Sequence, residues 1–211
     1  MSEPNPSVCV VLAITSSTAF LETAKILNLE RAYDTLAMFF PTVTIHVVAS
    51  SSDIDRFRTL PGENMRRAVL VPCETMEPEN LAKKLVQFWR DSKSVLIHDA
   101  SRPFVDHEQF ERVLKAFDED VDAVRPAMPF TETLKILTAD SIITETLDRS
   151  TVLRISTPEL IRTSAIDING LDCSWFLPLK KNANIVHVEG SPSGLRINSQ
   201  SDASLMELQQ D

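Results

Sequence analysis

Residues 95–104 have the sequence VLIHDASRPF, and this stretch decides the fold. Its three opening apolar residues predict a strand that is buried on both faces, and Pro103 ends it because a proline nitrogen cannot donate to a strand ladder. Asp99 is therefore expected at the carboxyl end of a central strand, the edge where open α/β sheets bind ligands. There Asp99 can hold a divalent metal, and Arg102 can pair with a phosphate. The alternative is that Asp99 caps the turn and Arg102 is a surface charge.

The composition predicts a globular chain, with 211 residues of which 43% are hydrophobic and 24% are charged. A formal net charge of -9 disfavours binding to nucleic acids or to anionic membranes. Cys9, Cys73 and Cys173 are widely spaced, which predicts neither a disulfide framework nor a zinc site. The apolar run Val8–Ile14 is too short to cross a bilayer and no basic region precedes it, so we expect a reducing, cytoplasmic location.

Apolar, β-branched runs alternate with segments of helical periodicity. This alternation predicts an α/β fold of Rossmann-like type, three layers α/β/α with a mainly parallel sheet, and we expect the whole chain 1–211 to form one domain. The predicted strands are 8–14, 42–49, 68–71, 95–97, 123–127, 183–188 and 195–197. The predicted helices are most of 19–40, a short one through Phe57 and Leu60, and others opened by Glu77, Asp106, Thr157 and Ser201. Asp106 and Gln109 together fit a capping box.

An inserted hairpin interrupts the alternation. Residues 133–137 and 142–147 are predicted to be its two strands, with Asp140 and Ser141 at the turn. An extended hairpin cannot bury its apolar face alone. We therefore expect an arm, at about 133–158, through which the chain forms a homodimer.

Five stretches form a series of motifs: IHDASRPF at 97–104, PAMPFTETLK at 126–135, ETLDRS at 145–150, ISTPE at 155–159 and VEGSPSGLRI at 188–197. They resemble HDAARPF, PALPVTDTLK, ETVDRS, AQTPQ and VEGDP..NIKIT of the 2-C-methyl-D-erythritol 4-phosphate cytidylyltransferases and their ribitol-phosphate relatives. Glu159 follows the Thr-Pro pair where this family has glutamine, and Arg196 replaces a lysine. The resemblance implies a fold of the nucleotide-diphospho-sugar transferase type, with the hairpin as its dimerisation arm.

The resemblance also implies a reaction of isoprenoid biosynthesis, in which CTP and a polyol phosphate give a CDP-polyol and pyrophosphate. The site residues that it implies are Asp99, Arg149 and Arg196 for catalysis, Arg102, Thr133 and Thr157 for substrate binding, and Asp99 for Mg²⁺ in an active enzyme. In this family the arm that carries Thr133 and Arg149 crosses a dimer interface and helps to bind the partner's acceptor phosphate.

Two nucleotide-binding stretches of the family are missing. The family's first strand leads into a loop of the type LAAGxGxRxG, whose glycines let backbone N–H groups approach the triphosphate. Residues 12–20, LAITSSTAF, contain no glycine and no arginine, and Ile14 and Ser16 are expected to occupy space that the phosphates need. The cytosine-binding stretch GGxxRxxSV is replaced by PCETMEPEN at 72–80, whose acids are expected to repel a triphosphate. Activity is therefore predicted to be weak or lost.

The sequence leaves two functions open. One is a divergent cytidylyltransferase. The other is a non-catalytic relative that acts as a phosphate-ligand binder through Arg149 and Arg196, as a partner subunit or as a regulator. A dinucleotide-binding dehydrogenase is disfavoured, because no GxGxxG follows the first strand.

Overall fold

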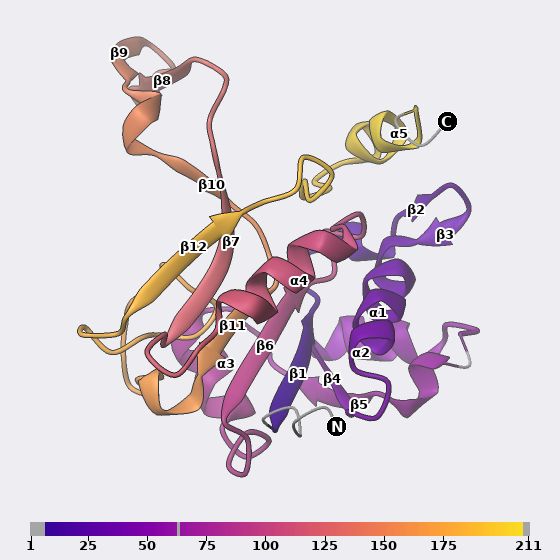
Figure 1. Ribbon diagram of the computed structural model, residues 1–211. Helices are drawn as coiled ribbons and strands as arrows, with labels where there is room; N and C mark the ends of the chain where they lie inside the picture. The colour runs from indigo at the N-terminus through magenta and orange to yellow at the C-terminus, as the bar shows by residue number, and fades with distance from the viewer. Residues whose placement is uncertain (1–6, 63, 209–211) are drawn as a thin grey trace.

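A mainly parallel sheet forms the centre of the molecule (Figure 1). The computed structural model describes residues 7–62 and 64–208, so residues 1–6, 63 and 209–211 of the expected 1–211 domain lie outside it. The strands are β1 (Val8–Ala13), β4 (Ile45–Ala49), β5 (Val69–Pro72), β6 (Ser94–Asp99), β7 (Ala123–Pro129), β10 (Leu153–Ile155), β11 (Glu159–Arg162) and β12 (Ile185–Glu189). Their order is β10-β7-β11-β6-β1-β4-β5, with β12 parallel to β7. β10 and β11 are antiparallel to their neighbours.

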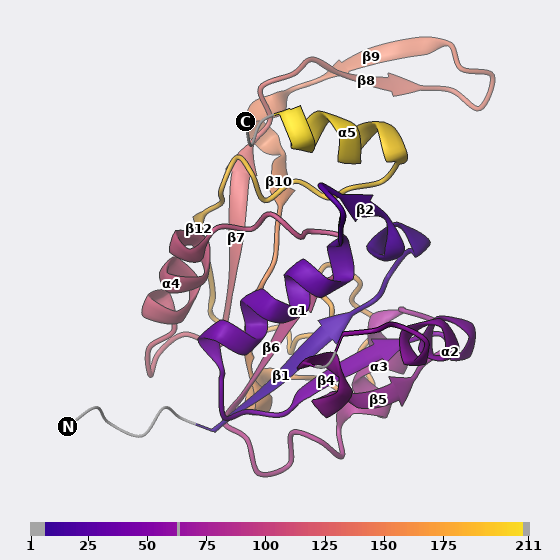
Figure 2. The ribbon, with the colours of Figure 1, turned by 90° about the vertical axis from the view of Figure 1, so that its right-hand side faces the viewer.

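Helices cover both faces of this sheet (Figure 2). The helices are α1 (Asn28–Phe39), α2 (Ser51–Arg58), α3 (Pro78–Leu85), α4 (His107–Ala116) and α5 (Gln200–Leu208). Val10 and Leu12 of β1 pack into the same core cluster as α1, α2 and α4, whereas Cys9 and Val11 pack into the cluster that contains α3. This alternation follows from the period of two along a strand. Among the described residues, no helix has the length and apolar character to cross a membrane.

The predicted hairpin is confirmed. β8 (Leu134–Leu137) pairs antiparallel with β9 (Ile143–Leu147), and the two strands extend away from the central sheet (Figure 2). Its large apolar side chains are exposed, including Ile136, Leu137, Ile142 and Ile143. The arm therefore has an apolar surface that the chain itself leaves uncovered.

Three predicted elements are wrong. Residues 19–40 are not mostly one helix: a short 3-10 helix η1 (Ser17–Phe20) and a small hairpin, β2 (Glu22–Thr23) with β3 (Ile26–Leu27), precede α1. The hairpin turns at Ala24 and Lys25, which both have positive φ, and the periodic apolar residues begin only beyond it.

The segment after Thr157 is the strand β11 and not a helix, because its backbone pairs with β6, with Glu159 opposite Ile97. Residues 195–197 form no strand. Their contact with the loop after β6 is a backbone bond from the N–H of Ile197 to the carbonyl of Ser101, at 2.8 Å.

Candidate functional site

The carboxyl ends of β1 and β6 lie side by side and bring Thr15 to Asp99. Ala13 is paired with Asp99 in the parallel register, so the residues that follow β1 meet the end of β6. Asp99 is only 4% exposed. Its Oδ1 accepts from the hydroxyl of Thr15 at 3.0 Å and from the N–H of Ser101 at 2.9 Å. Asp99 is thus a buried carboxylate held in one orientation at the ligand-binding edge of the sheet.

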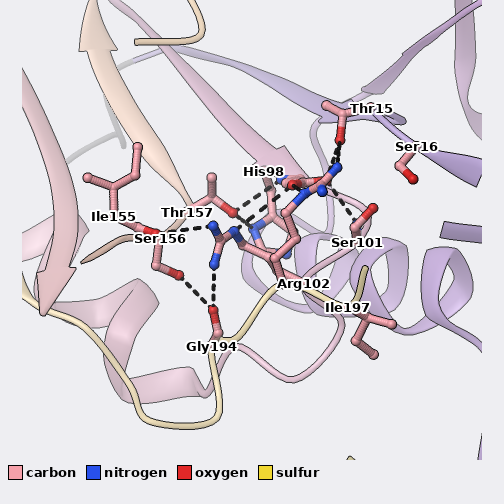
Figure 3. Close-up of polar contacts among 12 residues, drawn as sticks. Thr15, Ser16, His98, Ser101, Arg102, Ile155, Ser156, Thr157, Gly194 and Ile197 are labelled. Atoms are coloured by element: carbon pink, nitrogen blue, oxygen red, sulfur yellow. Dashed lines mark hydrogen bonds and ion pairs between the residues drawn. The ribbon is translucent and has the colours of Figure 1, made fainter. Parts of the chain in front are cut away.

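Two arginines lie near the same oxygen of this carboxylate, Oδ2, and Figure 3 shows one of them, Arg102, beside Gly194 and Ile155. Arg196 donates from Nε to Oδ2 of Asp99 at 3.0 Å and from Nη2 to the hydroxyl of Thr15 at 2.9 Å. Arg102 donates to the carbonyls of Gly194 and Ile155 at 2.8 and 3.1 Å, and its Nε lies 4.0 Å from Oδ2 of Asp99. Burial lowers the pKa of Arg102, while the charge of Asp99 acts in the opposite direction.

The hydroxyl of Thr157 connects the backbone of Asp99 to His98. It accepts from the N–H of Asp99 at 3.2 Å and lies 2.9 Å from Nδ1 of His98. Burial lowers the pKa of His98 to about 4, so its imidazole is neutral near pH 7 and Nδ1 can accept the hydroxyl proton. His98 therefore positions Thr157 and adds no charge to the site.

Glu159 and Arg125 form a second buried ion pair behind the first, with 3.4 Å between Oε1 and Nη1. Burial raises the pKa of Glu159 to about 7, although the N–H of Phe176, which donates to Oε2 at 2.8 Å, and the charge of Arg125 lower it. Arg125 also donates to the carbonyl of Ser174 and lies 4.1 Å from the ring centroid of Trp175. The pair thereby ties the loop around residues 174–176 to the sheet.

These groups border a cavity of about 350 Å³, which we call the Asp99 cavity. It is lined by Thr15, Met76, Asp99, Arg102, Ile155, Ser156, Thr157, Glu159, Phe176 and Arg196. Of the six predicted site residues, the structure therefore brings together Asp99, Arg102, Thr157 and Arg196. It does not bring Thr133 and Arg149 to them: both are exposed on the arm, where Arg149 donates to the carbonyl of Thr131 at 2.5 Å.

Sequence reasoning missed Gln109. Asp106 caps α4 by accepting from the N–H of Gln109 at 2.7 Å, but the side chain of Gln109 does not return to complete a capping box. It is fully buried instead, where it donates to the carbonyl of Thr157 at 2.6 Å and accepts from the N–H of Ser191. Gln109 thus fastens two loops of the cavity together. No local signal separates this role from capping.

In the segment 14–21, where the family has its glycine-rich loop, side chains pack into the core and cap a short helix. The prediction that Ile14 occupies phosphate space is wrong, because Ile14 is 2% exposed and packs in the core. The hydroxyl of Ser16 caps η1 by accepting from the N–H of Thr18 at 3.2 Å. Phe20 is buried beneath the guanidinium of Arg56, 4.1 Å from its ring centroid. The segment therefore packs against the core and does not form an open loop whose backbone N–H groups surround a phosphate.

The segment 72–80 borders a separate cavity of about 590 Å³ that also includes Ser51, Lys83 and Lys84. Its acids have protein partners. Glu74 accepts from the N–H of Ser51, in the first turn of α2, at 3.2 Å, and Glu79 pairs with Lys83. Glu74 thus takes one of the backbone donors at this helix terminus.

Asp99 does not have the donor set of a magnesium site. Both of its oxygens already accept hydrogen bonds, from Thr15 and Ser101 on one side and from Arg196 on the other. The other carboxylate of the cavity, Glu159, is bound to Arg125 and to the N–H of Phe176. Over residues 7–62 and 64–208, no three His, Cys, Asp or Glu side chains gather closely enough to hold a metal ion.

The fold and the ligand-binding edge of the sheet define the class of the protein: a Rossmann-like α/β protein with a mainly parallel sheet. Solved structures have the same fold. The 4-diphosphocytidyl-2C-methyl-D-erythritol synthase of Anaerococcus prevotii superimposes with a TM-score of 0.75 at 20% identity, over 98% of this chain and 96% of that one. The family model of IspD, 2-C-methyl-D-erythritol 4-phosphate cytidylyltransferase, matches residues 15–169. The chain belongs to this family.

Curated relatives cover shorter stretches of the chain. The bifunctional enzyme IspD/IspF of Rhizobium rhizogenes is 44% identical over 72 residues, which are 34% of this chain and 18% of that protein. The bifunctional enzyme IspD/IspF of Mesorhizobium japonicum is 32% identical over 119 residues, 56% of this chain and 29% of that protein. The chain therefore matches less than a third of the length of these relatives.

Proposed function

We propose that this chain binds a phosphate ester in the Asp99 cavity and transfers cytidylyl groups from CTP weakly or not at all. The observation that carries the second part is the segment 14–21, which holds a buried phenylalanine and no glycine or arginine where the family approaches the triphosphate. Loss of cradle N–H groups and of a cation removes transition-state charge stabilisation worth several kcal/mol.

The acceptor side supports the first part of the proposal. Arg102 and Arg196 line the cavity, and each guanidinium has N–H donors beyond those that its protein contacts use, which suits a small phosphate ester such as the family's 2-C-methyl-D-erythritol 4-phosphate. In this proposal Thr133 and Arg149 act across a dimer interface, on the ligand of the partner subunit.

Calorimetric titration with CTP and Mg²⁺ tests the nucleotide part. We expect no detectable binding at millimolar CTP. Binding in the micromolar range that is lost in Asp99→Asn contradicts the proposal. A parallel titration with 2-C-methyl-D-erythritol 4-phosphate is expected to show binding that Arg196→Gln weakens about tenfold. The matched control is Arg58→Gln, which removes an exposed arginine far from the cavity and is expected to bind as the wild type does.

A second candidate is a divergent but active cytidylyltransferase. It is favoured by the convergence of Asp99, Arg102, Thr157 and Arg196 on one cavity in a chain of this family. Release of pyrophosphate from CTP in the presence of a polyol phosphate, abolished in Asp99→Asn, would establish it.

The exposed apolar surface of the arm supports a homodimer. We expect sedimentation equilibrium to give a dimer for the wild type and a monomer for a variant with Ile142→Asp and Ile143→Asp. Leu171→Asp is the control, since Leu171 is 77% exposed and lies away from the arm. A wild-type chain that stays monomeric at high micromolar concentration contradicts the proposed dimer.

A further inference from the structure

We infer that the cation opposite Asp99 is the guanidinium of Arg196 and not a divalent metal, so that anion binding in the Asp99 cavity is independent of Mg²⁺. The second half of this inference rests on the proposed phosphate-ester site. The first half rests on the contacts of Asp99 and Arg196 alone.

Arg196 is fixed in place on three sides. Its Nε donates to Asp99 at 3.0 Å, its Nη2 to the hydroxyl of Thr15 at 2.9 Å and its Nη1 to Oδ1 of Asn198 at 2.5 Å. A planar guanidinium can satisfy three such partners at once, whereas the point charge of a lysine, the family's residue here, cannot reproduce that fork. The replacement therefore allows one cation to bind Asp99, Thr15 and Asn198 together.

A metal would have to displace this network. Mg²⁺ requires oxygen ligands at about 2.0–2.1 Å in octahedral geometry. Oδ2 of Asp99 accepts from Arg196, and Oδ1 accepts from Thr15 and Ser101. A metal at Oδ2 would therefore lie beside the positive charge of Arg196, and a metal at Oδ1 would displace a hydrogen bond to a buried carboxylate. Glu159 is a poor second ligand, because its Oε1 faces the charge of Arg125 and its Oε2 accepts from the N–H of Phe176.

The net charge of the side chains around the cavity then favours the binding of an anion without a metal. Arg196 neutralises Asp99, and Arg125 neutralises Glu159. Arg102 adds a further positive charge at the cavity wall, where its Nη atoms are held by the carbonyls of Gly194 and Ile155. A phosphate monoester can thus meet a cationic wall without a bridging metal.

Titration with Mn²⁺, followed by electron paramagnetic resonance, tests the cation assignment. We expect the wild type to bind no Mn²⁺ below millimolar concentration. Arg196→Met exposes the carboxylate and is expected to bind Mn²⁺ at least tenfold more tightly, and the double variant with Asp99→Asn is expected to lose that gain. Arg196→Lys, which keeps the charge, serves if Arg196→Met does not fold, and is expected to show a smaller gain. Submillimolar Mn²⁺ binding by the wild type that Asp99→Asn abolishes overturns the inference, as does a folded Arg196→Met that gains no Mn²⁺.

Titration with inorganic phosphate, in a buffer with EDTA and in a buffer with millimolar Mg²⁺, tests the second half. We expect the same affinity in both buffers. Binding that needs Mg²⁺ overturns the inference and leaves the proposed phosphate-ester site intact. Absence of phosphate binding in both buffers contradicts the proposed site and the metal-independent binding, while the Mn²⁺ titration still decides the cation assignment.

Discussion

The Asp99 cavity and the segment 14–21 lie at the same edge of the sheet, yet they are built in opposite ways. The cavity collects charged and hydroxyl side chains from β6, β11 and the loop after β12, and each is held by at least one hydrogen bond. The segment 14–21 buries Ile14, Ala19 and Phe20 and carries no charge of its own. Because the two halves of the edge come from different segments, one can lose its ligand-binding character while the other keeps it.

The largest effect is expected from the buried pair behind the cavity. Arg125→Met leaves Glu159 buried without its counter-charge, and removal of one partner of a buried pair costs about 3–5 kcal/mol. Urea unfolding measures this loss. Arg58→Met is the control, since its exposed pair with Asp55 is worth about 0–1 kcal/mol. Equal losses of unfolding free energy in the two variants would show that the buried pair contributes no more to stability than the exposed pair does.

The next effect tests whether segment 14–21 is packing. Phe20→Ala is expected to cost about 3 kcal/mol in unfolding free energy, because it opens a cavity under Arg56. Met38→Ala, at a side chain that is 59% exposed, is expected to change stability by about 0.5 kcal/mol or less. A loss below about 1 kcal/mol for Phe20→Ala would mean that the segment is an open loop after all, and the contrast with the cavity would fail.

Stability measured at several pH values compares two buried groups at the cavity, Glu159 and His98. The native pKa of Glu159 is raised from 4.5 to about 7, so the folded chain holds a proton that the unfolded chain loses, and this term lowers stability as the pH rises from about 4.5 to 7. The native pKa of His98 is lowered from 6.5 to about 4, so this term lowers stability as the pH falls from about 6.5 to 4.

The two terms oppose each other between pH 4.5 and 6.5. Relative to the wild type, Glu159→Gln is therefore expected to become more stable as the pH rises, and His98→Asn as the pH falls. Urea midpoints at four or five pH values, spanning about pH 4 to 8, measure both. Curves that stay parallel to the wild type would mean that neither group titrates as its burial predicts.

The smallest effect is expected for Thr15, which lies in the segment 14–21 and also lines the Asp99 cavity. Thr15→Val removes the hydrogen bonds to Asp99 and Arg196 with little change in shape, and about 1 kcal/mol of stability is expected to go with them. Thr59→Val, whose exposed hydroxyl donates to the carbonyl of Arg56, is the control and is expected to cost less. An unchanged unfolding free energy in Thr15→Val would show that Asp99 is held by Arg196 and Ser101 alone.

The sequence predicted β1, β4, β5, β6, β7 and β12, because their apolar runs are visible locally, but β10 was not predicted and β11 was predicted to be a helix. It placed Asp99 at the end of β6 for the same reason. It did not predict that Thr15 meets Asp99, since strand order is not encoded within any one segment. Arg125 and Glu159, which are 34 residues apart, pair only after β7 and β11 have come together. A charged residue inside the apolar run of β7 was nevertheless a signal that a buried partner exists.

Asp99 is bound by Thr15, 84 residues earlier in the chain, and by Arg196, 97 residues later. This spacing has a consequence for synthesis on the ribosome. β1, β4, β5 and β6 all emerge before residue 196, so the parallel half of the sheet can assemble while its central carboxylate still lacks the closer of its two arginines. The loop after β12 supplies Arg196 later. A nascent chain that stops short of residue 196 is therefore expected to hold its sheet loosely, and the addition of Arg196 stabilises it.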